Sequence, residues 1–482
     1  MRPLCVDLDG TLVKSDTLID SLLVLLRTHP LQVFKLPFMV LQGKAAFKAF
    51  VTSSVALDVV HLPYNRPLLQ YLQAERARGR AIYLATGADE RLAQRVADHL
   101  GIFTGVLGSD GATNLTGNNK LNSLKARLSS EPASGSGLAP GSAAFDYIGN
   151  DTPDLPLLAE AVEPMVANPS PGLRIGLKSR GIHPVQTFNE TTHPLQSLIK
   201  AARPHQWAKN LLIFLPVLLS HTLYPAKLLA GLAAFCCFSL TASSTYMFND
   251  LLDIEADRRH PHKQFRPFAS GDLSGLTGFA TAAILLIVGL IGGSLIGGRF
   301  FIWLIVYLAT TVSYSWYLKR VALVDVLVLS GLYTLRMQAG SAATDTPISH
   351  WLAGLSIFLF LSLAMVKRFA ELENLRMSGA PLKNGRGYLI SDTEQLRAFG
   401  TASGYAAVVV FAIYISASDV TSLYHHPSTL WLIVPLIILW ISRIWLLASR
   451  GELNEDPVVF ALTDRLSLLI GVAVGVIAFA AL

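Results

Sequence analysis

The chain has 482 residues, of which 52% are hydrophobic and 15% charged, and a formal net charge of +6. It is too apolar and too long to be one soluble domain, so we expect a membrane protein that also carries a soluble part. The modest positive charge predicts no nucleic-acid partner, because membrane topology explains it better. The first residues, MRPLCVDLDGT, enter a strand directly, which favours a cytosolic N-terminal part without a secretory signal.

Three short apolar runs in residues 1–183 predict buried strands, at 4–8, 81–85 and 145–148. Each run ends in polar residues, and helical patterns lie between them. Strands that alternate with helices indicate an α/β domain with a parallel, Rossmann-like sheet. Its site is expected where the carboxyl ends of the strands meet.

The polar residues after these runs occur in a fixed order: DLDGT, then Thr86, then Lys120, then GNDTPDLP. This series resembles the four motifs of the haloacid dehalogenase superfamily, over nearly all of residues 1–183. The resemblance implies that Asp7 is a nucleophile forming an aspartyl-phosphate and Asp9 a general acid/base, while Thr86 and Lys120 orient the phosphate. It also implies Mg²⁺, held by Asp7, Asp9, Asp151 and Asp154.

The last of these motifs departs from the family pattern. It usually begins Gly-Asp, and here it begins Gly149-Asn150. The departure leaves open whether Asp151 or Asp154 is the main metal ligand, and whether the domain is a fast phosphatase.

An insertion at about 15–75 resembles the helical cap of that superfamily. Its many apolar residues have two interpretations: they form the cap's own core, or they form a surface that rests on a membrane or receives a lipid-linked substrate. Residues 184–196 are predicted to link this domain to the rest of the chain.

Residues 197–482 predict an all-α polytopic membrane domain with nine transmembrane helices. The apolar segments lie near 210–222, 227–248, 276–297, 300–318, 322–343, 350–370, 401–418, 428–449 and 466–482. With the N-terminus inside, the inner loops contain most of the Lys and Arg residues, and the outer loops contain only Lys227 and Arg299. This asymmetry predicts a multi-pass protein of the bacterial inner (plasma) membrane with a cytosolic N-terminal domain.

The stretch NDLLDIEADRRHPHKQFRPFASG, from Asn249 to Gly271, follows the second apolar segment. On one continuous helix, Asn249, Asp250, Asp253 and Asp257 share a face, while Glu255 points away toward solvent or a partner. Carboxylates held this close usually bind a hard divalent cation, so we expect Mg²⁺ on the three aspartates. Acidic residues that directly continue an apolar helix favour this interpretation over a merely solvated loop.

Basic residues follow at once, including Arg258 and Arg266. A metal and several cations side by side would bind a polyanion, most simply a diphosphate. Together with ARPHQWAKN, YSWYLKR and MVKRFAEL, this stretch resembles the UbiA superfamily of intramembrane prenyltransferases, from about Gln196 to the C-terminus. Its closest resemblance is to the decaprenyl-phosphate phosphoribosyltransferase branch, whose members move phosphoribose from phosphoribosyl pyrophosphate onto a polyprenyl phosphate and release pyrophosphate.

Many superfamily members carry a second acidic cluster between the fourth and fifth spans, whereas this chain has only Asp325, with Leu329 where a partner would be. Basic groups predominate instead. Arg336 lies within an apolar segment, where we expect it to contact phosphate; the alternative is a side chain that snorkels or bonds to carbonyls. The predicted substrate-binding residues are Asn249, Arg258, Arg266, Lys209, Lys319, Arg320, Asp325, Arg336, Lys367 and Arg368.

The two resemblances together imply a bifunctional membrane enzyme. Its membrane domain would make a polyprenyl-phosphoryl ribose 5-phosphate, and its front domain would remove the 5-phosphate. The alternative enzyme is a prenyltransferase that moves a polyprenyl group from its diphosphate to an aromatic acceptor. A third interpretation is a non-catalytic lipid-binding or scaffolding protein that carries a phosphatase.

Overall fold

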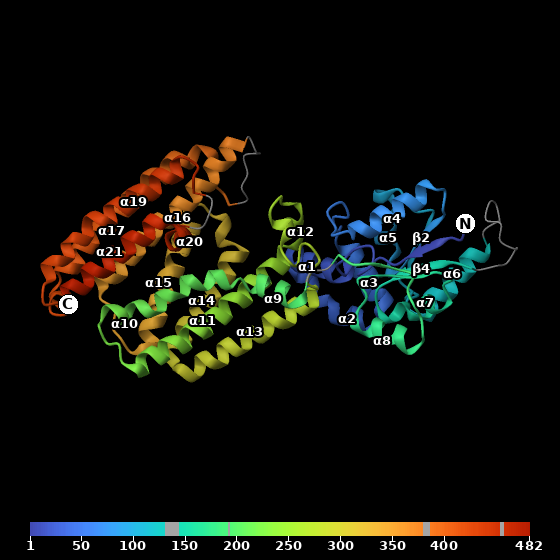
Figure 1. Cartoon of the computed structure of the whole chain (residues 1–482), viewed down its shortest axis with the longest axis horizontal. Coiled ribbons are helices and arrows are strands. Elements are labelled where there is room, and N and C mark those ends of the chain that lie inside the picture. The colour runs from blue at the N-terminus through green and yellow to red at the C-terminus, as the bar shows by residue number, and fades with distance from the viewer. Residues whose placement is uncertain (131–143, 191–192, 379–385, 454–456) are drawn as a thin grey trace. The chain divides into compact units, whose positions relative to one another are not determined.

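The computed structural model describes residues 1–130, 144–190, 193–378, 386–453 and 457–482. It divides into two compact units. The first contains residues 1–202 and 246–282, and the second contains 203–245 and 283–482. Figure 1 shows the first unit's blue and teal elements around a sheet, and the second unit's long helices in green to red.

The first unit is built on a six-stranded parallel sheet with the strand order β3-β2-β1-β4-β5-β6. The central strand β1 pairs Leu4 with Ile82 on one side and with Asp146 on the other, so the chain changes direction across the sheet at β1. Ligand sites of parallel sheets lie at such a switch point. The strands are β1 (Leu4–Val6), β2 (Ile82–Asp89), β3 (Gly105–Ser109), β4 (Asp146–Gly149), β5 (Pro164–Ala167) and β6 (Gln186–Phe188).

Helices cover both faces of this sheet because its strands are apolar on both sides. Leu4 and Val6 belong to the core under α4 and α5, whereas Cys5 belongs to the core under α6, α7 and α8. Figure 1 shows these two layers on opposite sides of the strands. The bounds are α4 (Arg66–Ala77), α5 (Glu90–Leu100), α6 (Asn118–Ser130), α7 (Leu155–Glu160) and α8 (Pro171–Ser179). The predicted α/β sheet domain is therefore confirmed.

The insertion is helical, as predicted, with α1 (Thr17–Thr28), η1 (Pro30–Lys35), α2 (Leu36–Leu41) and α3 (Lys44–Ser54). Leu25 and Val51 are fully buried, so part of its apolar content forms a core. Leu31, Phe34 and Leu41 are instead 79%, 76% and 85% exposed. The cap's core does not account for these three side chains, and their contact with a membrane or a lipid stays a prediction.

The region between sheet and membrane helices differs from the predicted linker. Gln186–Phe188, inside the expected linker 184–196, pairs with β5 as the edge strand β6. The Phe188 side chain is buried in the core of the sheet domain. The helix α9 (Pro194–Ala202) also belongs to the first unit. The sheet domain thus extends beyond residue 183.

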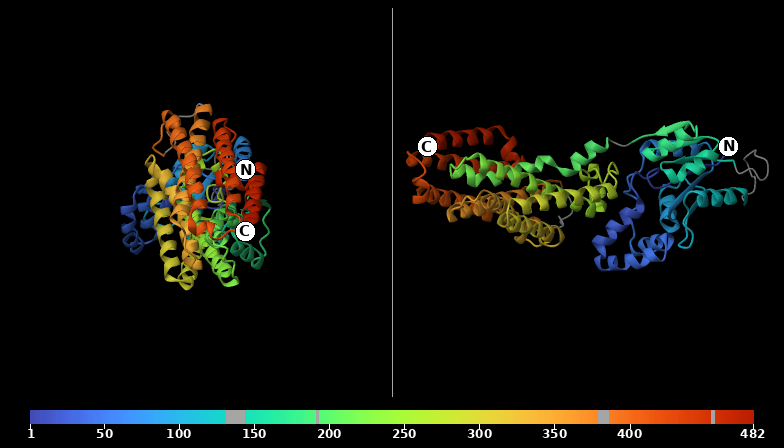
Figure 2. Two further views of the ribbon diagram at one scale, coloured as in Figure 1. Left: turned by 90° about the vertical axis from the view of Figure 1, so that its left-hand side faces the viewer. Right: turned by 90° about the horizontal axis from the view of Figure 1, so that it is seen from below.

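The second unit is helical. Its core includes a stacked pair, Tyr333 and Phe360, whose ring centroids are 4.5 Å apart. Both views in Figure 2 show the orange and red helices α16, α17, α19 and α21 running side by side. The elements are η3 (Pro204–Phe214), α10 (Leu215–Leu219), α11 (Pro225–Leu252), α13 (Gly275–Ile296), α14 (Gly298–Trp316), η5 (Leu318–Arg320), α15 (Val324–Thr344), α16 (His350–Ser378), η6 (Ile390–Asp392), α17 (Thr393–Ser416), α18 (Ser418–Thr421), η7 (Pro427–Leu432), α19 (Ile433–Ser449), α20 (Pro457–Thr463) and α21 (Arg465–Ala481), with α11 and α13 each contributing one end to the first unit.

Five helices within the described ranges are long and apolar enough to cross a membrane, or six if the bent pair α20–α21 counts as one span. A helical membrane domain is therefore confirmed, and the number nine stays a prediction. The first predicted segment, 210–222, is not one long helix. It contains the end of η3 and the five-residue α10, which begins just before Pro216, because proline removes a backbone donor and interrupts regular helix.

Candidate functional sites

The front site lies at the carboxyl end of β1, where the Lys120 ammonium joins two carboxylates. Lys120 Nζ lies 3.0 Å from Asp7 Oδ1 and 3.0 Å from Asp154 Oδ1, and it is almost fully buried. It also donates to the Tyr147 hydroxyl at 3.0 Å. The sequence analysis missed Tyr147, although its place on strand β4, two residues before the GNDTPD motif, is a usable signal. The end of β1, helix α6 and the turn after β4 thus bring Asp7, Lys120 and Asp154 together.

Asp9 lies on the turn after β1 and accepts a hydrogen bond from the Thr17 backbone amide at 2.8 Å. Burial, and then the charge of Asp16, raise the pKa of Asp9 to about 8. Burial also raises the pKa of Asp7, to about 6, although Lys120 opposes the shift. Asp9 therefore holds a proton at neutral pH while most Asp7 is ionised, which suits an acid and a nucleophile respectively.

The two acidic candidates of the last motif have different surroundings. Asp154 is buried and also accepts from the Asn150 amide at 3.1 Å. Asp151 is exposed and accepts from the Thr152 amide and the Ser170 hydroxyl, both at 2.7 Å. The site therefore contains Asp154, while Asp151 is directed elsewhere.

These residues do not form the expected metal cage. No group of three or more His, Cys, Asp or Glu side chains in the described part of the chain is placed to hold a metal ion. In the front site, the Lys120 ammonium already separates Asp7 from Asp154. Mg²⁺ in this domain, on Asp7, Asp9, Asp151 and Asp154, stays a prediction.

Two further residues border this site. The Thr86 hydroxyl, fully buried, accepts from the Ala88 amide at 3.0 Å, so its phosphate contact stays a prediction. Lys48, from the cap helix α3, donates to the Gly87 carbonyl at 2.6 Å and to Asn114 at 2.9 Å. Burial lowers the pKa of Lys48. The sequence offered no local signal for Lys48, because only the fold brings the cap over β2.

The acidic segment begins at the end of α11 and continues into α12 (Ile254–Arg259). The helix is interrupted at Asp253, yet backbone hydrogen bonds of 2.9 Å from Asp253 to Asn249 and 2.8 Å from Asp257 to Asp253 keep the helical spacing. Arg266 Nη1 lies 3.0 Å from Asp250 Oδ1 and 2.7 Å from Asp257 Oδ2. These two carboxylates therefore converge on one positive charge.

Asp253 differs from the prediction, because its carboxylate pairs with Arg27 of helix α1. Of the three aspartates expected to act together, Asp250 and Asp257 therefore share Arg266, while Asp253 pairs with Arg27. Burial raises the pKa of Asp257, although Arg266 opposes the shift. A hard cation in place of the Arg266 guanidinium would meet two oxygen ligands of the type that Mg²⁺ prefers. The donor set at Asp250 and Asp257 fits Mg²⁺, and metal binding there stays a prediction.

Arg258 and Glu255 contact the front domain. Arg258 is buried and donates to Asp20 at 2.8 Å, to Ser15 at 3.0 Å and to the Ala269 carbonyl. These contacts occupy a guanidinium that we expected to bind substrate. Glu255 accepts a hydrogen bond from the Asp58 backbone amide at 3.0 Å. Glu255 was predicted to face either solvent or a partner surface, and this contact matches the second.

In the second unit, Asp325 and Arg368 are both buried and bonded to each other. Arg368 Nε lies 2.5 Å from Asp325 Oδ2, and the Tyr388 hydroxyl donates to Asp325 Oδ1 at 2.5 Å. Arg368 also donates to Glu371 at 2.6 Å and to the Tyr314 hydroxyl at 3.0 Å. The structure gives both residues a structural role, and their contact with substrate stays a prediction.

Arg336 lies in an aromatic environment in the same unit. Its guanidinium carbon is 5.1 Å from the Tyr307 ring centroid and 5.5 Å from that of Phe238, distances at which a cation interacts with a ring. It donates to Asn210 Oδ1 at 2.8 Å and to the Leu332 carbonyl. The carbonyl-bonded interpretation of Arg336 is confirmed, and phosphate binding stays a prediction.

The other basic candidates lie on separate elements of the second unit. Lys209, on η3, lies 5.9 Å from the Tyr333 ring centroid. Lys319 and Arg320 lie on η5, and Lys367 lies on α16 next to Arg368. Their roles in binding substrate stay predictions.

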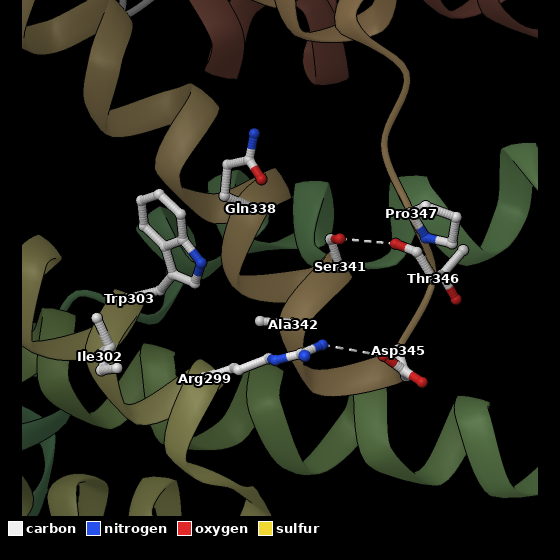
Figure 3. Close-up of a pocket in the computed structure, with 9 residues that line it drawn as sticks. All are labelled: Arg299, Ile302, Trp303, Gln338, Ser341, Ala342, Asp345, Thr346 and Pro347. Atoms are coloured by element: carbon white, nitrogen blue, oxygen red, sulfur yellow. Dashed lines mark hydrogen bonds and ion pairs between the residues drawn. The ribbon is translucent and has the colours of Figure 1, made fainter.

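A pocket of about 390 Å³ also lies in the second unit, where Arg299 on α14 faces Asp345 after α15 (Figure 3). None of the predicted site residues lines it. Its ion pair, at 3.5 Å, joins two strongly exposed side chains, and such pairs contribute little. No catalytic or binding role is assigned to this pocket.

Residues 211–479 match the model of the UbiA prenyltransferase family. The chain belongs to this family. An uncharacterized protein of Sinorhizobium fredii, y4nM, is 35% identical over 97% of this UbiA family member and 89% of its own length. Its similarity therefore extends through the front domain.

A decaprenyl-phosphate phosphoribosyltransferase of Mycobacterium tuberculosis is 34% identical over 284 residues, which cover 57% of this chain and 91% of that protein. Among solved structures, a UbiA homolog from Archaeoglobus fulgidus bound to GPP and Mg²⁺ is 17% identical, covering 58% of this chain and 99% of that one, with a TM-score of 0.45. The similarity to named enzymes thus spans little more than half of this UbiA chain.

Proposed function

We propose that the membrane domain transfers 5-phosphoribose from phosphoribosyl pyrophosphate to a polyprenyl phosphate at the cytosolic face of a bacterial inner membrane. The similarity to a decaprenyl-phosphate phosphoribosyltransferase supports the reaction. The observation that supports this reaction most is Asp325, whose carboxylate oxygens bind Arg368 and Tyr388. A prenyl diphosphate bound between two acidic clusters would need a second carboxylate that faces the metal, whereas the Asp325 carboxylate is paired with the Arg368 guanidinium.

In this reaction the bond from ribose C1 to the pyrophosphate oxygen breaks, and a bond from C1 to a lipid phosphate oxygen forms. Asp250 and Asp257 would hold Mg²⁺, which supplies positive charge to the departing pyrophosphate. Arg266, released from the two carboxylates, would remain next to the same anion. The lipid phosphate is already an anion, so the protein needs no general base to activate it.

One assay separates the candidate functions. We would offer the purified full-length chain a polyprenyl phosphate together with phosphoribosyl pyrophosphate, and in parallel a polyprenyl diphosphate with an aromatic acceptor, and weigh the lipid products by mass spectrometry. We expect only the first mixture to give a product, a lipid carrying a pentose with or without its phosphate. A prenylated aromatic product would support the prenyltransferase instead, and no product from either mixture would support the non-catalytic scaffold.

We further propose that the front domain removes the 5-phosphate from the lipid product. Asp7, with Lys120 at 3.0 Å, supports a nucleophile whose phosphoryl group meets a cation. Asp9, with its raised pKa, supports a proton donor for the leaving ribose oxygen. A water molecule would then cleave the aspartyl-phosphate and release inorganic phosphate.

The pH dependence of this hydrolysis is a specific prediction. Activity requires Asp7 as carboxylate, so it should rise as pH increases through about 6. It also requires protonated Asp9, so it should fall as pH increases through about 8. The rate of phosphate release from a soluble sugar phosphate, measured from pH 5 to 9, should therefore follow a bell-shaped profile with its maximum between about pH 6 and about pH 8. A flat profile would contradict these roles.

A further inference from the structure

Helix α1 of the front domain holds the acidic segment at two places. Its Asp20 binds the Arg258 guanidinium at 2.8 Å, and both side chains are 3% exposed. The Ser15 hydroxyl, just before α1, donates to Asp20 at 2.6 Å and accepts from Arg258 at 3.0 Å. A buried ion pair of this kind persists only when every member is bonded, because an unpaired buried charge is strongly unfavourable.

The last turn of α1 reaches one of the three aspartates, Asp253. Arg27 pairs with Asp253 and donates to the Leu252 carbonyl at 3.0 Å, at the end of helix α11. The guanidinium therefore binds both the side chain of one predicted metal ligand and the backbone that precedes it. Figure 1 shows α1 next to α12, and residues of the two helices are in contact.

Four more contacts join the same surfaces. Cap residue Asp58 binds Arg259 at 2.7 Å, and its amide donates to Glu255. Lys14 lies 3.3 Å from Asp272. At Gly275, the first residue of α13, a Cβ would come within 2.8 Å of the Ile19 side chain, so the helix backbones approach closely. The acidic segment and α1 thus share an interface that combines these ion pairs with close packing of Gly275 against Ile19.

We propose that the front domain is a docking platform for the acidic segment, and that Asp20 and Arg27 are positioning residues that hold the backbone carrying Asp250 and Asp257 in the geometry needed for transfer. The role in transfer rests on the proposed transferase function. Carboxylates that bind metals are normally held by a second hydrogen-bonding group, and loss of that group lowers affinity or activity by about 10- to 100-fold. Arg27 binds Asp253 and the Leu252 carbonyl, between Asp250 and Asp257, and so holds the backbone that carries these two carboxylates.

The test compares full-length variants in lipid nanodiscs. Arg27→Gln should lower kcat/KM for phosphoribosyl transfer by about tenfold or more, and raise the Mg²⁺ concentration that gives half the maximal rate. Arg27→Lys, which keeps the charge, should recover most of the loss. Arg78→Gln, which removes an exposed arginine paired with Glu75 elsewhere in the front domain, is the matched control and should equal the wild type. Wild-type rates and Mg²⁺ dependence in Arg27→Gln would overturn the positioning role.

Docking itself is measured without substrate, by hydrogen exchange of residues 246–273. Asp58→Arg and Arg259→Asp should each accelerate exchange there, and the double variant, which restores an ion pair, should slow it again. Unchanged exchange in both single variants would overturn the platform. If the wild type shows protected exchange but no phosphoribosyl transfer with any lipid phosphate, the proposed function is wrong and the docking platform stands on its own.

Discussion

Replacing Asp250 by Asn should reduce phosphoribosyl transfer by at least about a hundredfold, the upper range seen when metal ligands lose supporting groups. Asp250 and Asp257 face a single nitrogen of Arg266, at 3.0 and 2.7 Å. Asn keeps the shape of the side chain but removes half of the negative charge that would hold a divalent cation there. The loss should appear mainly in kcat, because the departing pyrophosphate gains the most charge in the transition state.

Two controls make this result specific. Asp419→Asn changes an exposed aspartate of α18 and should leave the rate unchanged. Asp257→Asn should resemble Asp250→Asn, and the double variant should be little worse than either, because the two residues act as one unit. Thermal unfolding of each variant checks that the fold persists. A well-folded Asp250→Asn chain with the wild-type rate would show that these carboxylates do not take part in transfer.

The strand ends of the front domain could be predicted from the sequence because the information is local. Asp7 follows an apolar strand directly, and parallel strands place their carboxyl ends together. The approach of Asp154 to Asp7 follows from that rule, whereas Lys120 lies on helix α6 and was predicted from the family resemblance. The choice between Asp151 and Asp154 depended on which side chain turns inward, and the motif alone does not determine it.

The acidic segment shows where local patterns fail. An ideal helix places three aspartates on one face, but the pairing of Asp253 with Arg27 separates it from the other two. Arg27 lies in the cap, more than two hundred residues earlier in the chain, so no periodicity could reveal the contact. The same holds for Arg368 with Asp325, where two predicted substrate contacts bind each other instead.

Replacing Asp7 by Asn should cause the 5-phosphorylated lipid to accumulate, with the dephosphorylated product falling by about a thousandfold or more, as expected when a covalent nucleophile is lost. An amide is uncharged and far less nucleophilic, so no aspartyl-phosphate can form. Asn keeps the volume of Asp7 and can still accept a hydrogen bond from Lys120. Transfer in the membrane domain should continue at the wild-type rate.

The measurement is mass spectrometry of the lipid products, where loss of the phosphate is a fixed decrease in mass. Asp98→Asn, an exposed aspartate of α5 bonded to Gln94, is the matched control and should release phosphate normally. Asp9→Asn should also retain the phosphate, because the leaving oxygen then lacks its proton donor. If Asp7→Asn yields the dephosphorylated lipid at the wild-type rate, the front domain acts on a different substrate or only as the platform for the acidic segment.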